Sequence, residues 1–170
     1  STYNTITRYN ADRLPISQIT EGDIYDRHIG NTGGPGTRGY TGHYTSTSSG
    51  SDIAADGTIL RSLRHTTLVD KLTQKYTGYS DTEDKFTADG IIYSSDTTTV
   101  SRDRHLSTPT GESRSSNTYN AEGNLLKTVA NGYSLDRRSG ARTRNYYSET
   151  AFDPDTDEAR SSKSTGAGFD

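Results

Sequence analysis

Large apolar residues are sparse along this chain, and they return at a regular spacing. A motif of one apolar residue, any residue, Ala or Pro, and then an acid recurs every 33 residues, and its first copy lies 44 residues before the second. Self-similarity at a fixed period is the signature of a repeat architecture. The apolar anchors that begin these motifs are Tyr9, Ile53, Phe86, Tyr119 and Phe152.

A second landmark, an aspartate followed by a basic residue, keeps the same period. The pairs are Asp26-Arg27, Asp70-Lys71, Asp103-Arg104 and Asp136-Arg137. Two landmarks in one register predict a single tandem array over residues 1–170. Its copies span 9–52, 53–85, 86–118, 119–151 and 152–170. The first copy carries an 11-residue insertion in a Gly-rich stretch at about 30–50, and the last copy stops half-way.

The residue types of each copy favour strands over helices. Thr, Ser, Gly, Tyr and Asp dominate, and no long window spaces its apolar residues at 3.6. Asp-Gly and Glu-Gly pairs are strong turn signals. In the third copy they predict a strand over 85–87, a turn over 88–90 and a strand over 91–95. With a second strand pair around each Asp-Arg pair, we expect an all-β array of hairpin or meander units with three or four short strands per copy.

Two further features of the repeat constrain how its strands pair. The apolar column Ile16, Leu60, Tyr93 and Leu126 precedes the next, mostly apolar column by three residues, which favours a bend or bulge over clean alternation. Copies stacked directly on one another would also align their aspartates as opposed like charges, which destabilises a sheet. We therefore expect intervening strands between copies, or pairing of one copy's Asp with another copy's Arg or Lys.

One segment resembles a known family. The 14 residues Tyr119-Asn-Ala-Glu-Gly-Asn-Leu-Leu-Lys-Thr-Val-Ala-Asn-Gly132 are similar to a YD repeat, the unit of Rhs-type bacterial surface and toxin-shell proteins. The resemblance implies the same hairpin chemistry in this segment.

The composition limits how large a core the chain can bury. Hydrophobic residues make up 27%, and Leu, Ile, Val and Phe together number 24 of 170, yet the net charge is only −3. Ordering the backbone costs roughly 1–2 kcal/mol per residue. A thin core therefore needs dense backbone hydrogen bonding, neighbouring subunits or a partner surface.

The same composition excludes several classes of function. No Cys is present, so disulfides and thiolate chemistry are excluded. No apolar run is long enough to predict a membrane span. Acidic and basic residues nearly cancel and are interspersed, so we expect no nucleic-acid partner. An extracellular or surface-exposed location is favoured, and the sequence leaves the compartment open.

The candidate sites each have two interpretations. The repeated Asp-Arg/Lys pairs are either contacts to a periodic partner or solvated ion pairs within the sheet, which contribute little to stability when exposed. Asp153, Asp155 and Asp157 alternate like the start of a calcium loop. The loop would need Gly at its sixth position and Glu at its twelfth, where the chain has Glu158 and Ser164, so we expect a polar turn.

The remaining features give no sign of catalysis. The four histidines do not share one repeat column, so no metal site is expected. The stretch Gly33–Gly39 lacks the ending of a phosphate loop, and no Gly-x-Ser-x-Gly elbow occurs. We expect no cofactor and no enzyme. The expected function is a structural repeat protein that self-associates into a fibre, sheath or surface assembly as a homo-oligomer or filament. The alternative is a binding module or scaffold that lies along a periodic polymer, either a glycan or a protein filament.

Overall fold

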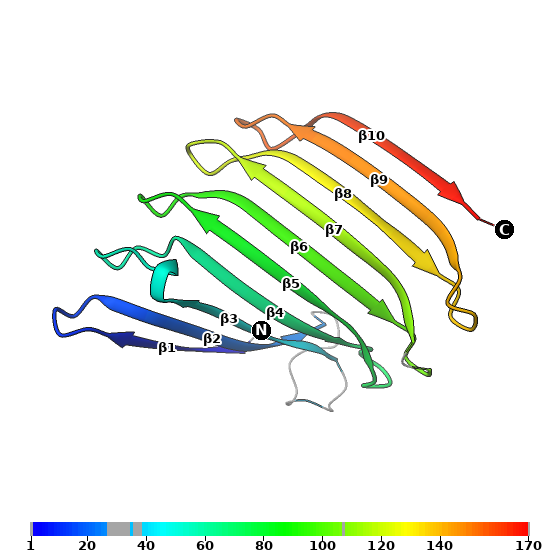
Figure 1. Ribbon diagram of the computed structural model, residues 1–170, viewed down its shortest axis with the longest axis horizontal. Helices are drawn as coiled ribbons and strands as arrows, with labels where there is room; N and C mark the ends of the chain where they lie inside the picture. The colour runs from blue at the N-terminus through cyan, green and yellow to red at the C-terminus, as the bar shows by residue number, and fades with distance from the viewer. Residues whose placement is uncertain (1, 27–34, 36–38, 107, 170) are drawn as a thin grey trace.

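The chain forms one open sheet of ten antiparallel strands. The computed structural model describes residues 2–26, 35, 39–106 and 108–169. Each strand pairs with its neighbours in sequence, so the order β1 to β10 is a simple meander, and Figure 1 shows it fanning from one edge to the other. The all-β hairpin prediction is confirmed. The strands are β1 Thr2–Tyr9, β2 Pro15–Tyr25, β3 Tyr40–Ser49, β4 Arg61–Val69, β5 Tyr76–Phe86, β6 Ile92–Arg102, β7 Pro109–Tyr119, β8 Leu125–Leu135, β9 Arg142–Phe152 and β10 Ala159–Gly168.

The strands are longer and fewer than the sequence suggested. β5, β7 and β9 begin 33 residues apart, and each has 11 residues. Each 33-residue stretch there therefore holds two long strands, and the prediction of three or four short ones was wrong. The bulges that interrupt the apolar pattern shift the register without ending the pairing.

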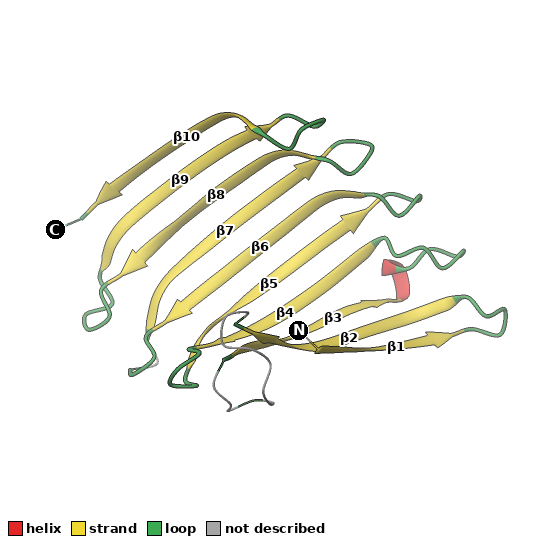
Figure 2. Cartoon of the chain, turned by 180° about the vertical axis from the view of Figure 1, so that it is seen from behind, coloured by secondary structure: helices red, strands yellow, loops and turns green. Residues whose placement is uncertain are grey.

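The chain turns at two opposite ends of the sheet, drawn in green in Figure 2. The turn after β5 lies at 88–90, as predicted. Gly90 has φ +77° and donates its N–H to the carbonyl oxygen of Thr87 at 3.0 Å. A single 3-10 turn, Gly50–Asp52, precedes a bridge between Ile53 and Ile59. Among the residues described, no helix has the length and apolar character that crossing a membrane would require.

The predicted bulges are present near the ends of the strands. Lys85 pairs with Ser94 and Phe86 with Ile92, so Tyr93 is the extra residue. Ile16 and Leu126 take the equivalent place in β2 and β8, whereas Leu60 lies just before β4. The bend or bulge expected at the column Ile16, Leu60, Tyr93 and Leu126 is therefore present as a shift in strand register at three of these four residues.

The opposite ends of the strands carry a second set of bulges. Here the extra residues are Thr41, Thr77, Thr110 and Thr143. A glycine follows the first three. At Gly78 a Cβ would lie 2.0 Å from the carbonyl oxygen of Val100. Only glycine allows the neighbouring strand to approach so closely.

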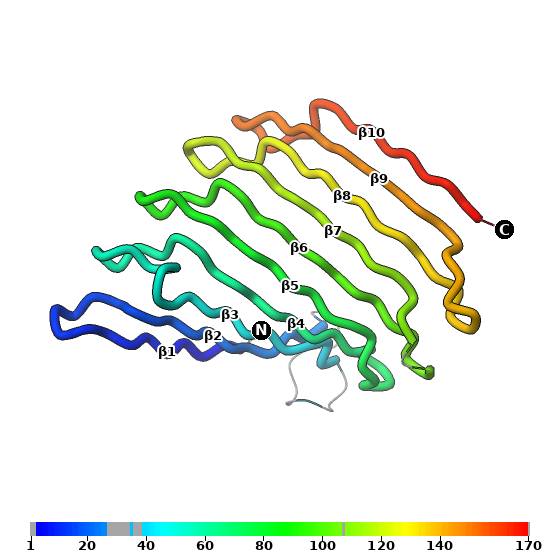
Figure 3. Tube along the Cα trace, in the orientation of Figure 1, coloured from blue at the N-terminus to red at the C-terminus, as the bar shows by residue number. Residues whose placement is uncertain are grey.

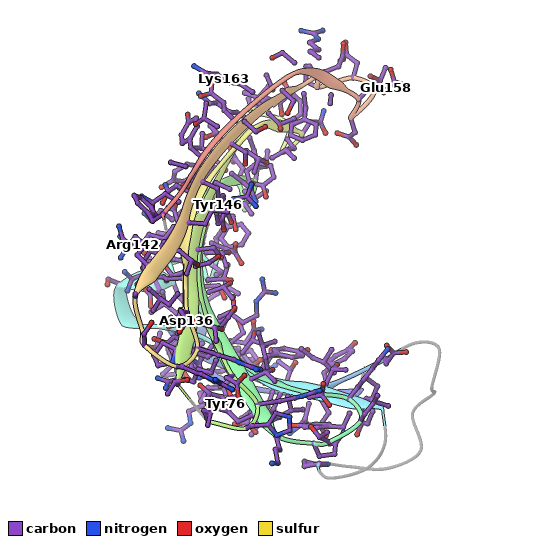
Figure 4. The ribbon with its side chains drawn as sticks, turned by 90° about the vertical axis from the view of Figure 1, so that its right-hand side faces the viewer. Tyr76, Asp136, Arg142, Tyr146, Glu158 and Lys163 are labelled. Atoms are coloured by element: carbon purple, nitrogen blue, oxygen red, sulfur yellow. The ribbon has the colours of Figure 1, made fainter. Side chains whose placement is uncertain are left out.

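The sheet is strongly curved along its strands. Figure 4 shows it edge-on as an arc, with Tyr146 on the concave side and Lys163 on the convex side. Successive residues of a strand point to opposite faces, and paired residues share a face. The concave face therefore carries Gly132, which pairs with Tyr146, and the convex face carries Glu149, which pairs with Lys163.

The two faces differ in the size of their side chains, which accounts for the curvature. In β5 to β8 the concave face carries almost only Ser, Thr, Gly and Ala, as in the cross-strand row Thr82, Thr97, Ser115 and Ala130. The adjacent convex row is Glu83, Asp96, Ser116 and Val129. Because bulky side chains crowd one face and small ones leave room on the other, the sheet bends toward the small side chains.

The core is as thin as the composition predicted. Among the described residues Tyr40 and Ile53 are the buried hydrophobic side chains, and no side chain is fully buried. Hydroxyl groups on the concave face pair across strands instead. Thr82 Oγ1 lies 3.0 Å from Thr97 Oγ1, and Thr5 Oγ1 lies 3.0 Å from Thr20 Oγ1. Cross-strand pairs of this kind each contribute roughly 0.2–1 kcal/mol.

Candidate functional site

The repeated Asp-Arg/Lys pairs lie together at one end of the sheet. Asp26, Asp70, Asp103 and Asp136 directly follow β2, β4, β6 and β8, which all run toward this end. We call the turns at 70–75, 103–108 and 136–141 the basic turn row. Arg27 and part of the stretch predicted to hold the insertion, residues 30–34 and 36–38, lie outside the described residues, whereas β3 occupies most of the rest of that stretch.

Each aspartate of this row shapes its own turn. Asp70 Oδ1 accepts hydrogen bonds from the backbone N–H of Thr73 at 2.8 Å, from the Thr73 hydroxyl at 2.8 Å and from the N–H of Leu72 at 3.2 Å. These bonds favour the ionised form, and they lower the pKa of Asp70 to about 2. Backbone N–H groups likewise lower the pKa of Asp103 and Asp136.

The basic partners link one hairpin to the next. Lys71 Nζ lies 2.8 Å from Asp26, and Arg104 Nη1 lies 3.2 Å from Asp70. Arg137 Nη1 lies 3.9 Å from Asp103. The Asp of one hairpin thus pairs with the Lys or Arg of the hairpin that follows. This is the expected pairing of one copy's Asp with another copy's basic residue. These contacts support the interpretation of the Asp-Arg/Lys pairs as ion pairs within the sheet.

The two signs of charge are unequally exposed along this row. The side chains of Asp70 and Asp103 are 22% and 12% exposed, because they turn inward to bind backbone. Those of Lys71, Arg104 and Arg137 are 45%, 47% and 59% exposed. This end of the sheet therefore presents mainly positive charge to solvent.

The other end of the sheet carries the apolar-x-Ala/Pro-acid motif. Tyr9, Phe86, Tyr119 and Phe152 are the last residues of β1, β5, β7 and β9, and Ile53 forms a bridge beside them. The five anchors therefore line one end of the sheet, and the acids that follow them occupy the turns. We call the turns at 10–14, 54–58, 87–91, 120–124 and 153–158 the acidic turn row.

The calcium candidate is part of this acidic row. Asp153 Oδ1 accepts the N–H of Asp155 at 2.9 Å, and Asp153 Oδ2 accepts a hydrogen bond from Arg160 Nε at 2.9 Å. Asp153 therefore shapes the turn, and the structure does not bring it together with Asp155 and Asp157. In the described parts of the chain, no three His, Asp or Glu side chains gather in a way that could hold a metal ion.

Both faces of the sheet also have open hollows, and the two largest among the described residues lie on opposite faces. The concave hollow, of about 610 Å³, spans β2 to β6; Tyr44, Leu68 and the charged Arg64 are among its lining residues, with several hydroxyls. A hollow of about 470 Å³ on the other side has a more charged lining, with His65 and Asp81 in contact. Both are shallow and open to water, and neither encloses a small molecule.

Two His–Asp pairs were missed from the sequence. His43 Nδ1 lies 3.0 Å from Asp23 Oδ1, and His65 Nδ1 lies 2.6 Å from Asp81 Oδ1. His65 also stacks on Tyr79, with ring centroids 5.7 Å apart. The partners lie 20 and 16 residues apart on adjacent strands. Predicting these two pairs requires the register between the adjacent strands, which the sequence pattern does not determine.

The arrangement as a whole offers ordered charge and hydroxyl groups on an open surface. Such a surface can bind another extended surface through many weak contacts. No protein-family model matches the chain, and no curated protein or solved structure matches it.

Proposed function

We propose that this chain is a non-enzymatic structural protein that self-associates into a fibre, sheath or surface assembly. The observation that supports it best is that the sheet is a single layer, with both faces open and almost no buried apolar side chain. A domain is ordinarily stabilised by two or more packed layers around one core. A single layer gains the missing stabilisation from contacts with neighbours.

The backbone at both outer strands adds to this argument. Within the described chain, β1 pairs only with β2 and β10 only with β9, and Figure 3 shows the two outer strands on opposite sides of the sheet. All ten residues of β10 are exposed. Such edges are templates for pairing with further strands.

Light scattering coupled to size exclusion, over a wide range of protein concentration, tests this proposal. We expect a mass that grows with concentration, and ordered particles or filaments by electron microscopy. Circular dichroism must show β structure in the same samples. A folded, stable monomer at the highest concentration would refute self-association.

A second candidate, a module that binds along a periodic polymer, is supported by the spacing of the turns. Successive hairpins place equivalent turns two strand spacings apart, about 9.6 Å. Deleting one 33-residue unit, residues 86–118, would then weaken binding to the polymer through the lost contacts. Unchanged affinity in a folded deletion variant would argue against this candidate.

A further inference from the structure

The two rows of turns carry opposite charge, so the sheet is polarised along its strands. The acidic turn row has eight carboxylates and one arginine. The basic turn row has five Lys or Arg residues and three aspartates. Figure 4 shows Glu158, from the acidic row, at the upper end of the arc and Asp136, from the basic row, well below it. Acidic and basic residues that are interspersed along the sequence thus lie at opposite ends of the sheet, because successive turns of the meander alternate between the two ends.

The exposure of the side chains sharpens this separation. The acids Asp12, Asp56, Asp89 and Glu122 at the turn tips are exposed. The aspartates of the basic row are mostly covered, as described above, while Lys75 and Arg138 add exposed cations to it. Solvent therefore meets carboxylates at one end and cations at the other.

The two rows also match in spacing. Each hairpin contributes one turn to either row, so both rows repeat every two strands, about 9.6 Å. An acidic row set against the basic row of another copy can therefore place opposite charges together at successive turns. Complementary charge patterns of this kind set the partner and the register of an interface.

We propose that the acidic turn row of one copy binds the basic turn row of a second copy, end to end along the strands. The contact joins two different surfaces of the same chain, so it is heterologous and propagates from copy to copy. Because each copy is bent along its strands, successive copies turn relative to one another and form a ring or a helical filament. This contact rests on the self-association proposed above and specifies the two surfaces through which the copies bind.

Charge reversal tests the contact without touching the ion pairs between hairpins. The first variant, Asp89→Lys/Glu122→Lys, makes the acidic row positive at two tips. The second, Lys75→Glu/Arg138→Glu, makes the basic row negative at two. Each variant alone is expected to lose association roughly tenfold or more, because like charges then face each other. An equimolar mixture restores it, since each reversed row meets an opposite row on the other variant.

A control matched to the second variant keeps its two basic-to-acidic changes and moves them off the turns. Arg64 and Arg114 are exposed in the middle of β4 and β7, so Arg64→Glu/Arg114→Glu is expected to assemble like the wild type. Association of the wild type must also weaken between about 0.1 M and 1 M NaCl, as the Debye length falls from about 10 to 3 Å.

The outcomes separate this contact from self-association as such. If both variants and the control assemble like the wild type, the turn-row contact is refuted and association by another surface stands. If the mixture fails to recover, or the control loses as much as the variants, the contact is likewise refuted. If the wild type itself stays monomeric at every concentration, the proposed function fails. Circular dichroism of each variant confirms folding, and recovery in the mixture requires two folded partners.

Discussion

Replacing Gly78 by alanine should destabilise the sheet far more than replacing a glycine in an open turn. Gly78 has φ +144°, and its added Cβ would lie 2.0 Å from the carbonyl oxygen of Val100 and 3.1 Å from the carbonyl carbon. A Cβ cannot approach a backbone oxygen that closely, so β6 must move away or the bulge must open. We expect a loss of about 3 kcal/mol or more in the free energy of unfolding, from the clash and the strained φ together.

Two other glycines separate these contributions. Gly140 has φ +70° with no atom within 4 Å of the added Cβ, so Gly140→Ala tests backbone strain alone, about 1–2 kcal/mol. At Gly111, which has no positive φ, an added Cβ would lie 2.6 Å from the Tyr133 carbonyl oxygen. Gly111→Ala therefore tests crowding alone, about 1–3 kcal/mol.

Urea unfolding followed by far-ultraviolet circular dichroism measures all three variants at a fixed protein concentration. The expected order of destabilisation places Gly78→Ala above both others. If Gly78→Ala costs no more than Gly140→Ala, the close approach of β5 and β6 at the bulge is not present in solution. The Thr-Gly bulges would then not be what holds β5 and β6 close together.

Three further predictions follow from the faces and the turns. Ala130→Phe, on the concave face where the bend fits only small side chains, should cost roughly 1–3 kcal/mol, whereas its neighbour Asn131→Phe, exposed on the convex face, should stay within about 0.5 kcal/mol; equal costs in urea unfolding would contradict the assignment of faces. A double-mutant cycle of Thr82→Val and Thr97→Val should show a coupling of about 0.2–1 kcal/mol from their hydroxyl pair, and a coupling of zero would remove the hydroxyl pairs as a source of stability. The pKa of Asp70 is lowered from 3.8 to about 2 in the folded state, so its contribution to the free energy of unfolding is complete above pH 4 and is lost as the pH falls toward 2. The urea midpoint of Asp70→Asn should therefore fall less over that range than the midpoint of the wild type. Parallel pH profiles of the two proteins would contradict this.

The features that sequence predicted best are those set by local chemistry. The turn at Gly90 follows from an Asp-Gly pair whose glycine accepts positive φ. The bulge at Tyr93 follows from an apolar spacing that neither helix nor flat strand explains. The charge pairing of Arg104 with Asp70 follows from avoiding opposed like charges. Each of these depends on a few residues close in sequence or related by one period.

The features that sequence missed depend on the register between strands. Strand length could not be fixed because Ser- and Thr-rich segments have no apolar alternation to mark where a strand continues. Without strand length, neither the partner of His65 nor the face of Ala130 is determined, since a slip of one residue moves every side chain to the other face. The segregation of acidic and basic turns was hidden for the same reason. Along the chain the two signs alternate, and only the meander sends them to opposite ends.

The shape of the sheet and its separation of charge have a common origin. A sheet with large side chains on both faces would stay flatter and require a second layer on each side. Here the small concave side chains, such as Thr82 and Ala130, let the strands bend and let their hydroxyl groups pair. Because of the bend, the two rows of turns do not face in directly opposite directions; in Figure 4 the arc curves between Glu158 at its upper end and Asp136 lower on its back. A copy joined end to end therefore continues the curve, so the same small residues that replace a core also determine the curvature of the assembly.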